Sequence, residues 1–147
     1  MKANVCKVCG FVSIDGKAPE KCPVCGSGRN AFEEKEDAVK LPADTLKMTD
    51  FEKKHTPVLK AEPKCALLEG CRDINVKTGE IKHPMLPEHF ITYLDFYLNR
   101  EFIGRFHLTP VRLNAAVTIH LSDASSGRIT AISKCNQHGA WMGEVDL

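Results

Sequence analysis

Apolar and polar residues alternate over most of the second half of the chain, which is the pattern of half-buried strands. The clearest run carries four apolar residues of one parity: Phe90, Leu94, Phe96 and Leu98. After Asn99-Arg100 a second run, 101–108, places Phe102, Phe106 and Leu108 on one face, so the two runs predict a hairpin. Further strands are expected at residues 56–61, 73–77, 115–121 and 128–134, with turns at 77–80 and 125–127. Five to seven short strands predict a mainly β fold, an antiparallel sandwich.

The first third of the chain has a different pattern. Residues 1–34 contain two Cys-x2-Cys pairs and few large apolar side chains, and residues 35–50 are charged and include Pro42. A segment of about 35 residues rarely folds on its own without a metal or disulfides. We therefore predict a small metal-knuckle domain at 1–34, a linker at 35–50 and a sandwich domain at 51–147.

Composition narrows the functional classes. Twenty Lys and Arg face 19 Asp and Glu, giving a formal charge of +1, and no basic run indicates a nucleic-acid partner. No apolar stretch approaches the ~18 residues of a membrane span, and the N-terminus has no apolar signal core. We therefore expect a cytoplasmic protein, in which the seven cysteines are more often metal ligands than disulfides.

Four of these cysteines form the motif Cys6-x2-Cys9-x12-Cys22-x2-Cys25. Two such pairs let four thiolates converge as a tetrahedron on one ion. Gly10 and Gly26 follow the second cysteine of each pair, where glycine permits a tight turn with N–H groups directed at sulfur. The same ligand set suits iron or zinc, so a purely structural zinc ribbon is the alternative.

The residues around this motif resemble a known domain. The stretches 5–11, 18–25 and 32–33 are similar to a rubredoxin domain, closest to the short form that ends rubrerythrins. The resemblance implies iron that cycles between Fe(II) and Fe(III) as an electron carrier.

All six histidines lie in the β half. His107 and His120 have the strand parity of outward-facing residues, so we interpret them as surface histidines. The other four stand in loops or at strand ends beside Pro or Gly: His55, His83, His89 and His138. Cys135 precedes His138 by three residues. Loops at the ends of a sandwich can bring such distant side chains together.

Three segments with these histidines, 52–57, 83–91 and 135–141, resemble the superoxide reductases, the neelaredoxin and desulfoferrodoxin family. The resemblance implies an immunoglobulin-like sandwich and a square-pyramidal iron with four equatorial histidines and an axial thiolate. The expected ligands are His55, His83, His89, His138 and Cys135. It also implies one-electron reduction of superoxide to hydrogen peroxide, a reduced donor such as rubredoxin or its reductase, and a homo-oligomer, either dimer or tetramer.

Two features depart from the family pattern. The residue two before the first histidine is usually Glu, described as a ligand of the oxidised iron, whereas here it is Lys53 and Glu52 stands one residue earlier. Either the loop is shifted by one residue or the carboxylate ligand is missing. Desulfoferrodoxins also carry two adjacent cysteines in their N-terminal domain, whereas this chain has separated pairs.

A thiolate opposite an open coordination position pushes electron density toward the metal. Lys54, beside the first histidine, is our candidate to attract the superoxide anion and to organise a proton-donating water; a solvated loop charge is the alternative. Asn136, Gly139 and Trp141 are expected to shape the surroundings of Cys135.

Cys65 and Cys71 fit neither motif. They could bind a third metal, form a redox disulfide or pack as small apolar residues, and we favour packing. For the whole chain, the alternatives to a superoxide reductase are a non-catalytic iron electron carrier or redox sensor, a zinc-stabilised interaction module, and a superoxide dismutase.

Overall fold

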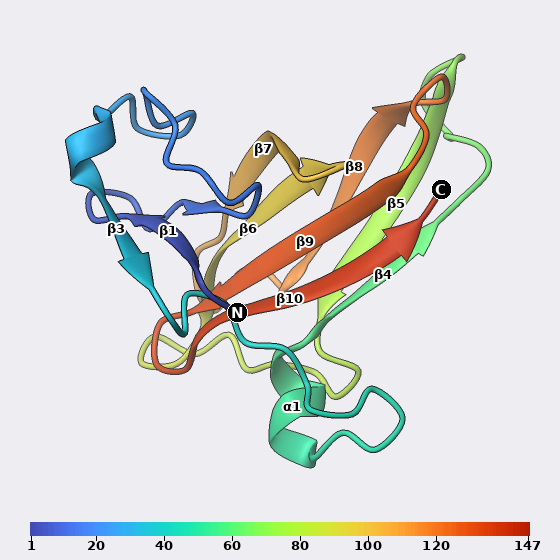
Figure 1. Ribbon diagram of the computed structural model, residues 1–147. Coiled ribbons are helices and arrows are strands. Elements are labelled where there is room, and N and C mark those ends of the chain that lie inside the picture. The colour runs from blue at the N-terminus through green and yellow to red at the C-terminus, as the bar shows by residue number, and fades with distance from the viewer.

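The computed structural model describes residues 1–147 and contains three antiparallel sheets (Figure 1). The first sheet has the order β2-β1-β3 and belongs to the small N-terminal unit. Its elements are β1 (Ala3–Cys6), β2 (Val12–Ser13), the short 3-10 helix η1 (Arg29–Ala31) and β3 (Phe32–Lys35).

The other two sheets pack face to face as a seven-stranded sandwich, with the orders β4-β5-β8 and β10-β9-β6-β7. The strands are β4 (Pro57–Ala61), β5 (Cys71–Thr78), β6 (Ile91–Leu98), β7 (Glu101–His107), β8 (Ala116–Ser122), β9 (Arg128–Cys135) and β10 (Gly139–Asp146). Inward side chains of both sheets form one core, which includes Ile74, Leu94 and Ala131. The predicted mainly β fold with an antiparallel sandwich is confirmed.

All six predicted strands are present, and the hairpin turns at Asn99-Arg100, where both residues have positive φ (49° and 72°). The seventh strand, β10, was not predicted. Its sequence contains Gly139 and Gly143, and glycine weakens the strand signal.

Two predicted faces are wrong. The pairing of β6 with β9 shifts between Ile91 and Tyr93, so Ile91 rather than Phe90 joins Leu94 and Phe96 in the core. The pairing of β6 with β7 shifts between Phe96 and Tyr97, so Phe102 lies opposite Tyr97 while Phe106 lies opposite Leu94. Phe102 therefore packs against Phe11 of the N-terminal unit, with ring centroids 5.2 Å apart, rather than on the face of Phe106. A bulge reverses the side-chain parity beyond it, and nothing in the alternation reveals its position.

The N-terminal unit packs on the outer face of β6. Tyr97 Oη donates to the Val12 carbonyl (2.7 Å), and Tyr93 Oη donates to the Gly10 carbonyl (3.1 Å). Seen in Figure 1, the unit lies beside the sheet that contains β6 and β9. Strand β6 is therefore covered on both faces, which explains why its polar-parity positions are buried too.

A buried ion pair lies at this contact. Arg105 donates to both carboxylate oxygens of Asp95 (2.5 and 2.7 Å) and to the Cys9 carbonyl (2.8 Å). Its guanidinium also stacks 3.6 Å from the centroid of the Tyr93 ring. The pair thus joins the sandwich to the backbone of the cysteine motif.

Part of the segment expected as a linker is packed. Val39 is completely buried, and Lys40 forms a parallel bridge with Trp141 of β10. The division into 1–34, 35–50 and 51–147 stays a prediction.

A six-residue helix, α1 (Asp50–His55), follows this segment and was not predicted. No helix of the structure has the length and apolar character needed to cross a membrane.

Candidate metal centres

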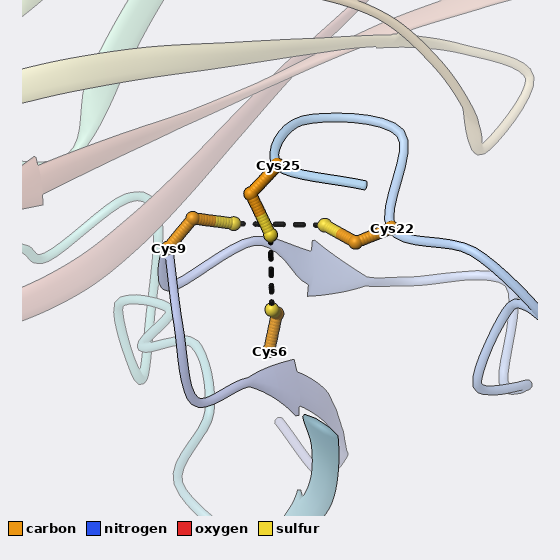
Figure 2. Close-up of side chains that lie close together, drawn as sticks. All are labelled: Cys6, Cys9, Cys22 and Cys25. Atoms are coloured by element: carbon orange, nitrogen blue, oxygen red, sulfur yellow. Dashed lines mark hydrogen bonds between the residues drawn. The ribbon is translucent and has the colours of Figure 1, made fainter. Parts of the chain in front are cut away.

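The four N-terminal cysteines converge on one point (Figure 2). Cys6 ends β1, and Cys9, Cys22 and Cys25 lie in the two connecting loops. Cys6 Sγ lies 3.7 Å from Cys25 Sγ, and Cys9 Sγ lies 3.5 Å from Cys22 Sγ. A tetrahedral ion with metal–sulfur bonds of about 2.3 Å would space its sulfurs about 3.8 Å apart. The geometry therefore fits a tetrathiolate site.

Two matching turns hold these sulfurs. Gly10 N–H donates to the Cys6 carbonyl and Gly26 N–H to the Cys22 carbonyl, both at 2.9 Å, and the two glycines have φ of 76° and 77°. A side chain at Gly10 would also meet Tyr93 Oη at 2.7 Å, so glycine is required both for the turn and for the contact with the sandwich.

The thiols differ in acidity. Burial raises the pKa of Cys9, while hydrogen bonding with Ser27 lowers the pKa of Cys25 to about 6. Four thiolates this close repel one another, so they ionise together only around a cation.

The four histidines that were expected in loops or at strand ends form the corners of a near-square, although His55 lies at the end of helix α1. Neighbouring ring centroids lie 4.9 Å apart for His55–His83, 4.8 Å for His83–His89, 4.9 Å for His89–His138 and 4.9 Å for His138–His55. Neighbouring rings cross at 75–82°, whereas the diagonal pair His55 and His89 lies 6.4 Å apart and only 31° from coplanar. Four imidazoles arranged in this way can bind the equatorial positions of one ion.

Cys135 supplies a fifth donor. It is fully buried at the end of β9, and its Sγ lies 3.7 Å from His138 Nδ1. The ligand atoms of Cys135, His55, His83 and His89 all lie within 4.8 Å of one another. The structure therefore brings together all five residues that the sequence singled out, from positions spread over 55–138.

Hydrogen bonds fix which ring nitrogen faces the centre. His55 Nδ1 donates to the Phe51 carbonyl and His83 Nδ1 to the Pro84 carbonyl, both at 2.7 Å. Their Nε2 atoms are thereby left as lone-pair donors. The Nε2 atoms of His83 and His89 are buried without a hydrogen-bond partner, a costly arrangement that a bound cation resolves.

The environment favours the neutral form of three of these rings, those of His55, His83 and His89. Burial, then the charges of neighbouring histidines, lowers the pKa of His83 to about 4 and lowers the pKa of His55 as well. Burial, the charge of His138 and that of nearby Lys54 lower the pKa of His89. Neutral imidazole is the form that binds a metal.

Aromatic rings and a lysine surround one side of the square. Phe51 packs 4.5 Å from His55 and 5.0 Å from His138, and Trp141 stacks 5.3 Å from His55. Trp141 Nε1 and Lys40 Nζ both donate to the His138 carbonyl (3.1 Å each). Lys40 and Phe51 were missed from the sequence because one lies in the expected linker and the other in the unpredicted helix.

Asn136 connects two of the metal-site loops. Its Oδ1 accepts from Phe90 N–H and its Nδ2 donates to the Glu88 carbonyl, both at 3.0 Å. Gln137 Nε2 donates to the same carbonyl at 2.7 Å. The loop that carries His89 is thus tied to the turn that carries Cys135 and His138.

Helix α1 carries His55 at its last position, and a capping box formed by Thr49 and Glu52 stabilises its N-terminus. The Glu52 carboxylate accepts from Thr49 N–H (2.8 Å) and Ala43 N–H (3.1 Å), so it is occupied at the helix start. Gly79 lets the chain pass close to this helix, since a Cβ there would lie 2.6 Å from the Lys54 carbonyl. The Lys54 side chain is exposed and belongs to none of the ion pairs.

A third group of metal-binding side chains lies elsewhere on the sandwich: Cys65, Cys71, Asp73 and His120. His107 and His120 are both exposed on strands, as predicted. His120 nevertheless belongs to this group, which the sequence did not indicate.

Comparison with known proteins agrees with this geometry. The desulfoferrodoxin family model matches residues 47–144, and the model of the rubrerythrin rubredoxin-like domain matches residues 5–33. The superoxide reductase of Pyrococcus abyssi is 34% identical over 116 residues, which cover 71% of this chain and 96% of that protein. Reverse rubrerythrin-1 of Clostridium acetobutylicum is 46% identical over 48 residues, 33% of this chain and 26% of that protein.

A solved structure with the same fold is the superoxide reductase (neelaredoxin) from Ignicoccus hospitalis, with a TM-score of 0.57 and 25% identity. The similarity covers 74% of this chain and 93% of that one. The chain therefore belongs to the desulfoferrodoxin family, that of the superoxide reductases, and carries a rubredoxin-like domain ahead of its sandwich.

Proposed function

We propose that this chain reduces superoxide to hydrogen peroxide at an iron ion held by His55, His83, His89, His138 and Cys135. The observation that carries the proposal is the near-square of four imidazoles beside one buried thiol. Bound iron would supply the single electron that converts superoxide to the peroxide level. The protein supplies four neutral nitrogen donors, one sulfur donor and a fixed orientation for each.

Lys54 is proposed to attract the anion and to hold a proton-donating water near the site. Its side chain is exposed and unpaired, and its charge is close enough to contribute to the lowered pKa of His89. A positive charge at the mouth of an anion site raises association rates by roughly ten- to a thousand-fold, and salt weakens the effect.

We also propose iron at Cys6, Cys9, Cys22 and Cys25, as a one-electron carrier, with zinc as the alternative. The direct contact between the Cys9 backbone and Arg105 of the sandwich supports a functional connection between the two centres. A reduced donor such as rubredoxin or its reductase, a homo-oligomeric assembly and a cytoplasmic location remain predictions from the sequence.

The decisive experiment is anaerobic purification, metal quantitation and pulse radiolysis with superoxide. We expect iron at both centres, rapid oxidation of the histidine-ligated iron, and hydrogen peroxide without oxygen release. Oxygen release without an added reductant would indicate a dismutase instead. Oxidation that does not turn over with any reductant would indicate an electron carrier or redox sensor.

Two substitutions test the residue roles. Cys135→Ser should abolish the sulfur-to-iron charge-transfer band of the histidine-cysteine centre while the rubredoxin-type spectrum persists. If that band is retained, Cys135 is not the sulfur ligand. Lys54→Ala should slow the reaction with superoxide at least about tenfold and flatten its dependence on ionic strength. Lys53→Ala is the matched control. Equal effects of the two substitutions would mean that Lys54 acts only through the overall positive charge of the loop and has no specific role.

A further inference from the structure

Four potential ligands outside both centres meet on the outer face of the β4-β5-β8 sheet. Cys71 and Asp73 are two residues apart on β5 and share a face, and His120 on β8 lies directly opposite Asp73. Cys65 reaches the same point from the loop at 62–70, at the upper right of Figure 1. Strand β5 separates this cluster from the histidine square, because its other end, Thr78, pairs with Pro57 just beyond His55.

The distances within the cluster centre on one nitrogen. His120 Nδ1 lies 2.9 Å from Asp73 Oδ1, 3.2 Å from Cys65 Sγ and 3.8 Å from Cys71 Sγ. The four ligand atoms all lie within 4.8 Å of one another. A ring nitrogen carries either one proton or one lone pair, so hydrogen bonding can satisfy only one of these three neighbours. A cation between the four atoms would satisfy them all.

A second observation concerns Asp73. Its Oδ1 is buried and makes no hydrogen bond, although it lies 2.9 Å from the imidazole nitrogen. The two atoms are near each other, but an N–H on the His120 ring nitrogen would not point at the Asp73 oxygen, so they form no hydrogen bond. That geometry is expected when both lone pairs are directed at a common third atom, and an unpartnered buried carboxylate oxygen is otherwise costly.

The sulfur of Cys65 has the surroundings of a metal-bound thiolate. Leu67 N–H donates to Cys65 Sγ at 3.3 Å, which is the type of backbone-to-sulfur contact that stabilises thiolate ligands. The rest of the loop has no apolar anchor, since Leu67 and Leu68 are 74% and 61% exposed. Cys65 is the least exposed side chain between 63 and 70, so it is the point at which the loop is held.

We propose that Cys65, Cys71, Asp73 and His120 bind a zinc ion that clamps the 62–70 loop onto β5 and β8. Two thiolates, one imidazole and one carboxylate are all zinc ligands, and four protein ligands complete a tetrahedron. A closed ligand set leaves no position for substrate, so the site is structural and independent of superoxide chemistry. Zinc binding, rather than the small-residue packing predicted from the sequence, is therefore the role of the two remaining cysteines.

The first test counts metal in the full-length chain, reduced and loaded with Zn²⁺ after purification with iron. We expect three metal ions per chain in the parent protein, and two in Cys65→Ser and in His120→Ala. The absorption of the histidine-cysteine and tetracysteine centres should be unchanged in both variants. His107→Ala, which removes another exposed strand histidine, is the matched control and should keep three.

Two ions per chain in the parent protein would overturn the proposal. So would a stable Cys65–Cys71 disulfide, detected as a loss of two hydrogens in the intact mass, that persists in protein purified with zinc present. These outcomes are read from metal content and mass, so they do not depend on enzyme activity.

The second test measures the clamp itself. Lys64 is an exposed trypsin site within the loop. Zn²⁺ should slow cleavage after Lys64 at least about tenfold in the parent protein and in His107→Ala, but not in His120→Ala. Cleavage at the same rate with and without Zn²⁺ in the parent protein would contradict a metal clamp. Because His120 and Cys65 lie on the surface side of the sheet, these variants keep the sandwich core intact.

Discussion

The two metal centres of the family fold are built in opposite ways. The tetracysteine centre takes all its potential ligands from residues 6–25, on two turns that repeat the same hydrogen bond. The histidine-cysteine centre gathers its potential ligands from residues 55–138, on a helix end, a long loop and the turn between β9 and β10.

The first centre therefore depends on contacts between residues close in sequence, and the second on contacts between residues far apart in sequence. A short stretch with closely spaced cysteines can wrap around a metal before the rest of the chain folds, because little loop entropy is lost. The second centre exists only after the two sheets have packed. The centres are nevertheless joined, since the N-terminal unit packs on β6 and shares the Arg105 contact.

The largest expected effect comes from breaking that contact. Arg105→Met would leave the Asp95 carboxylate, which is fully buried, without its partner. Burial already raises the pKa of Asp95, and removing one member of a buried pair costs about 3–5 kcal/mol. Urea unfolding should show this loss of stability, together with earlier exposure of the tetracysteine centre to a chelator.

The matched control for this prediction is Arg100→Met. Arg100 donates to the Ile14 carbonyl across the same contact but has no carboxylate partner, so about 1 kcal/mol is expected. The double variant Asp95→Leu with Arg105→Met should recover part of the loss. Equal costs for the two arginines would show that the buried pair has no special weight.

The next effect should be confined to the long-range centre. Asn136→Ala removes the two side-chain bonds by which Asn136 ties the His89 loop to the Cys135 turn. Loss of such supporting contacts typically weakens metal binding about 10–100-fold. Competition with a chromophoric chelator measures it, and the tetracysteine centre should be unaffected.

Gln137→Ala is the neighbouring control, since it removes a single exposed bond to the Glu88 carbonyl. It should change the affinity much less than Asn136→Ala. An equal loss for both variants would mean that the turn responds to any change rather than to the Asn136 bridge.

The metal-free sandwich should also depend on pH in a defined window. The folded pKa of His83 is about 4, against roughly 6.5 for an unfolded imidazole, so the unfolded chain binds more protons between these values. The contribution of neutral His83 to the free energy of unfolding should be complete above pH 6.5. The free energy of unfolding should then decrease as the pH drops toward 4. Urea midpoints of metal-free protein at pH 7, 6 and 5 measure the slope.

His83→Asn should flatten this slope, because it removes the most shifted of the buried imidazoles. His107→Asn, on an exposed strand position, should leave it unchanged. Midpoints that do not move between pH 7 and 5 in the parent protein would contradict the burial of neutral histidines.

Most of the fold follows from the sequence, and the misses have physical causes. Alternation located six strands because their two faces differ in polarity, but it could not position the register shifts in the pairing of β6 or the glycine-containing β10. The cysteine spacing indicates a local site directly. The histidine site depended on resemblance, because nothing in the spacing says which loops meet.

The third cluster shows the limit most clearly. Cys71 and Asp73 have the two-residue spacing of one strand face, and that signal is present in the sequence. The position of His120 across from Asp73 depends on strand order, and that of Cys65 depends on the path of a loop. Parity correctly placed His120 outside the core but could not show what lies beside it.

The smallest predicted effect concerns how the long-range centre is anchored at α1. Thr49→Ala should destabilise the protein by about 1 kcal/mol, because Thr49 caps the helix that ends at His55. Glu52→Gln should preserve most of the stability and the absorption of iron bound at the proposed site, since its one amide oxygen can still accept the capping-box bond from Thr49, while the bond from Ala43 to the other carboxylate oxygen is lost. Glu52→Ala loses these bonds and should resemble Thr49→Ala. A different outcome is a shift in the spectrum of the oxidised iron in Glu52→Gln with no change in stability. That result would mean that the Glu52 carboxylate moves from the helix cap to the iron on oxidation. The loop would then shift by one residue in the oxidised state, as the first of the two sequence alternatives requires.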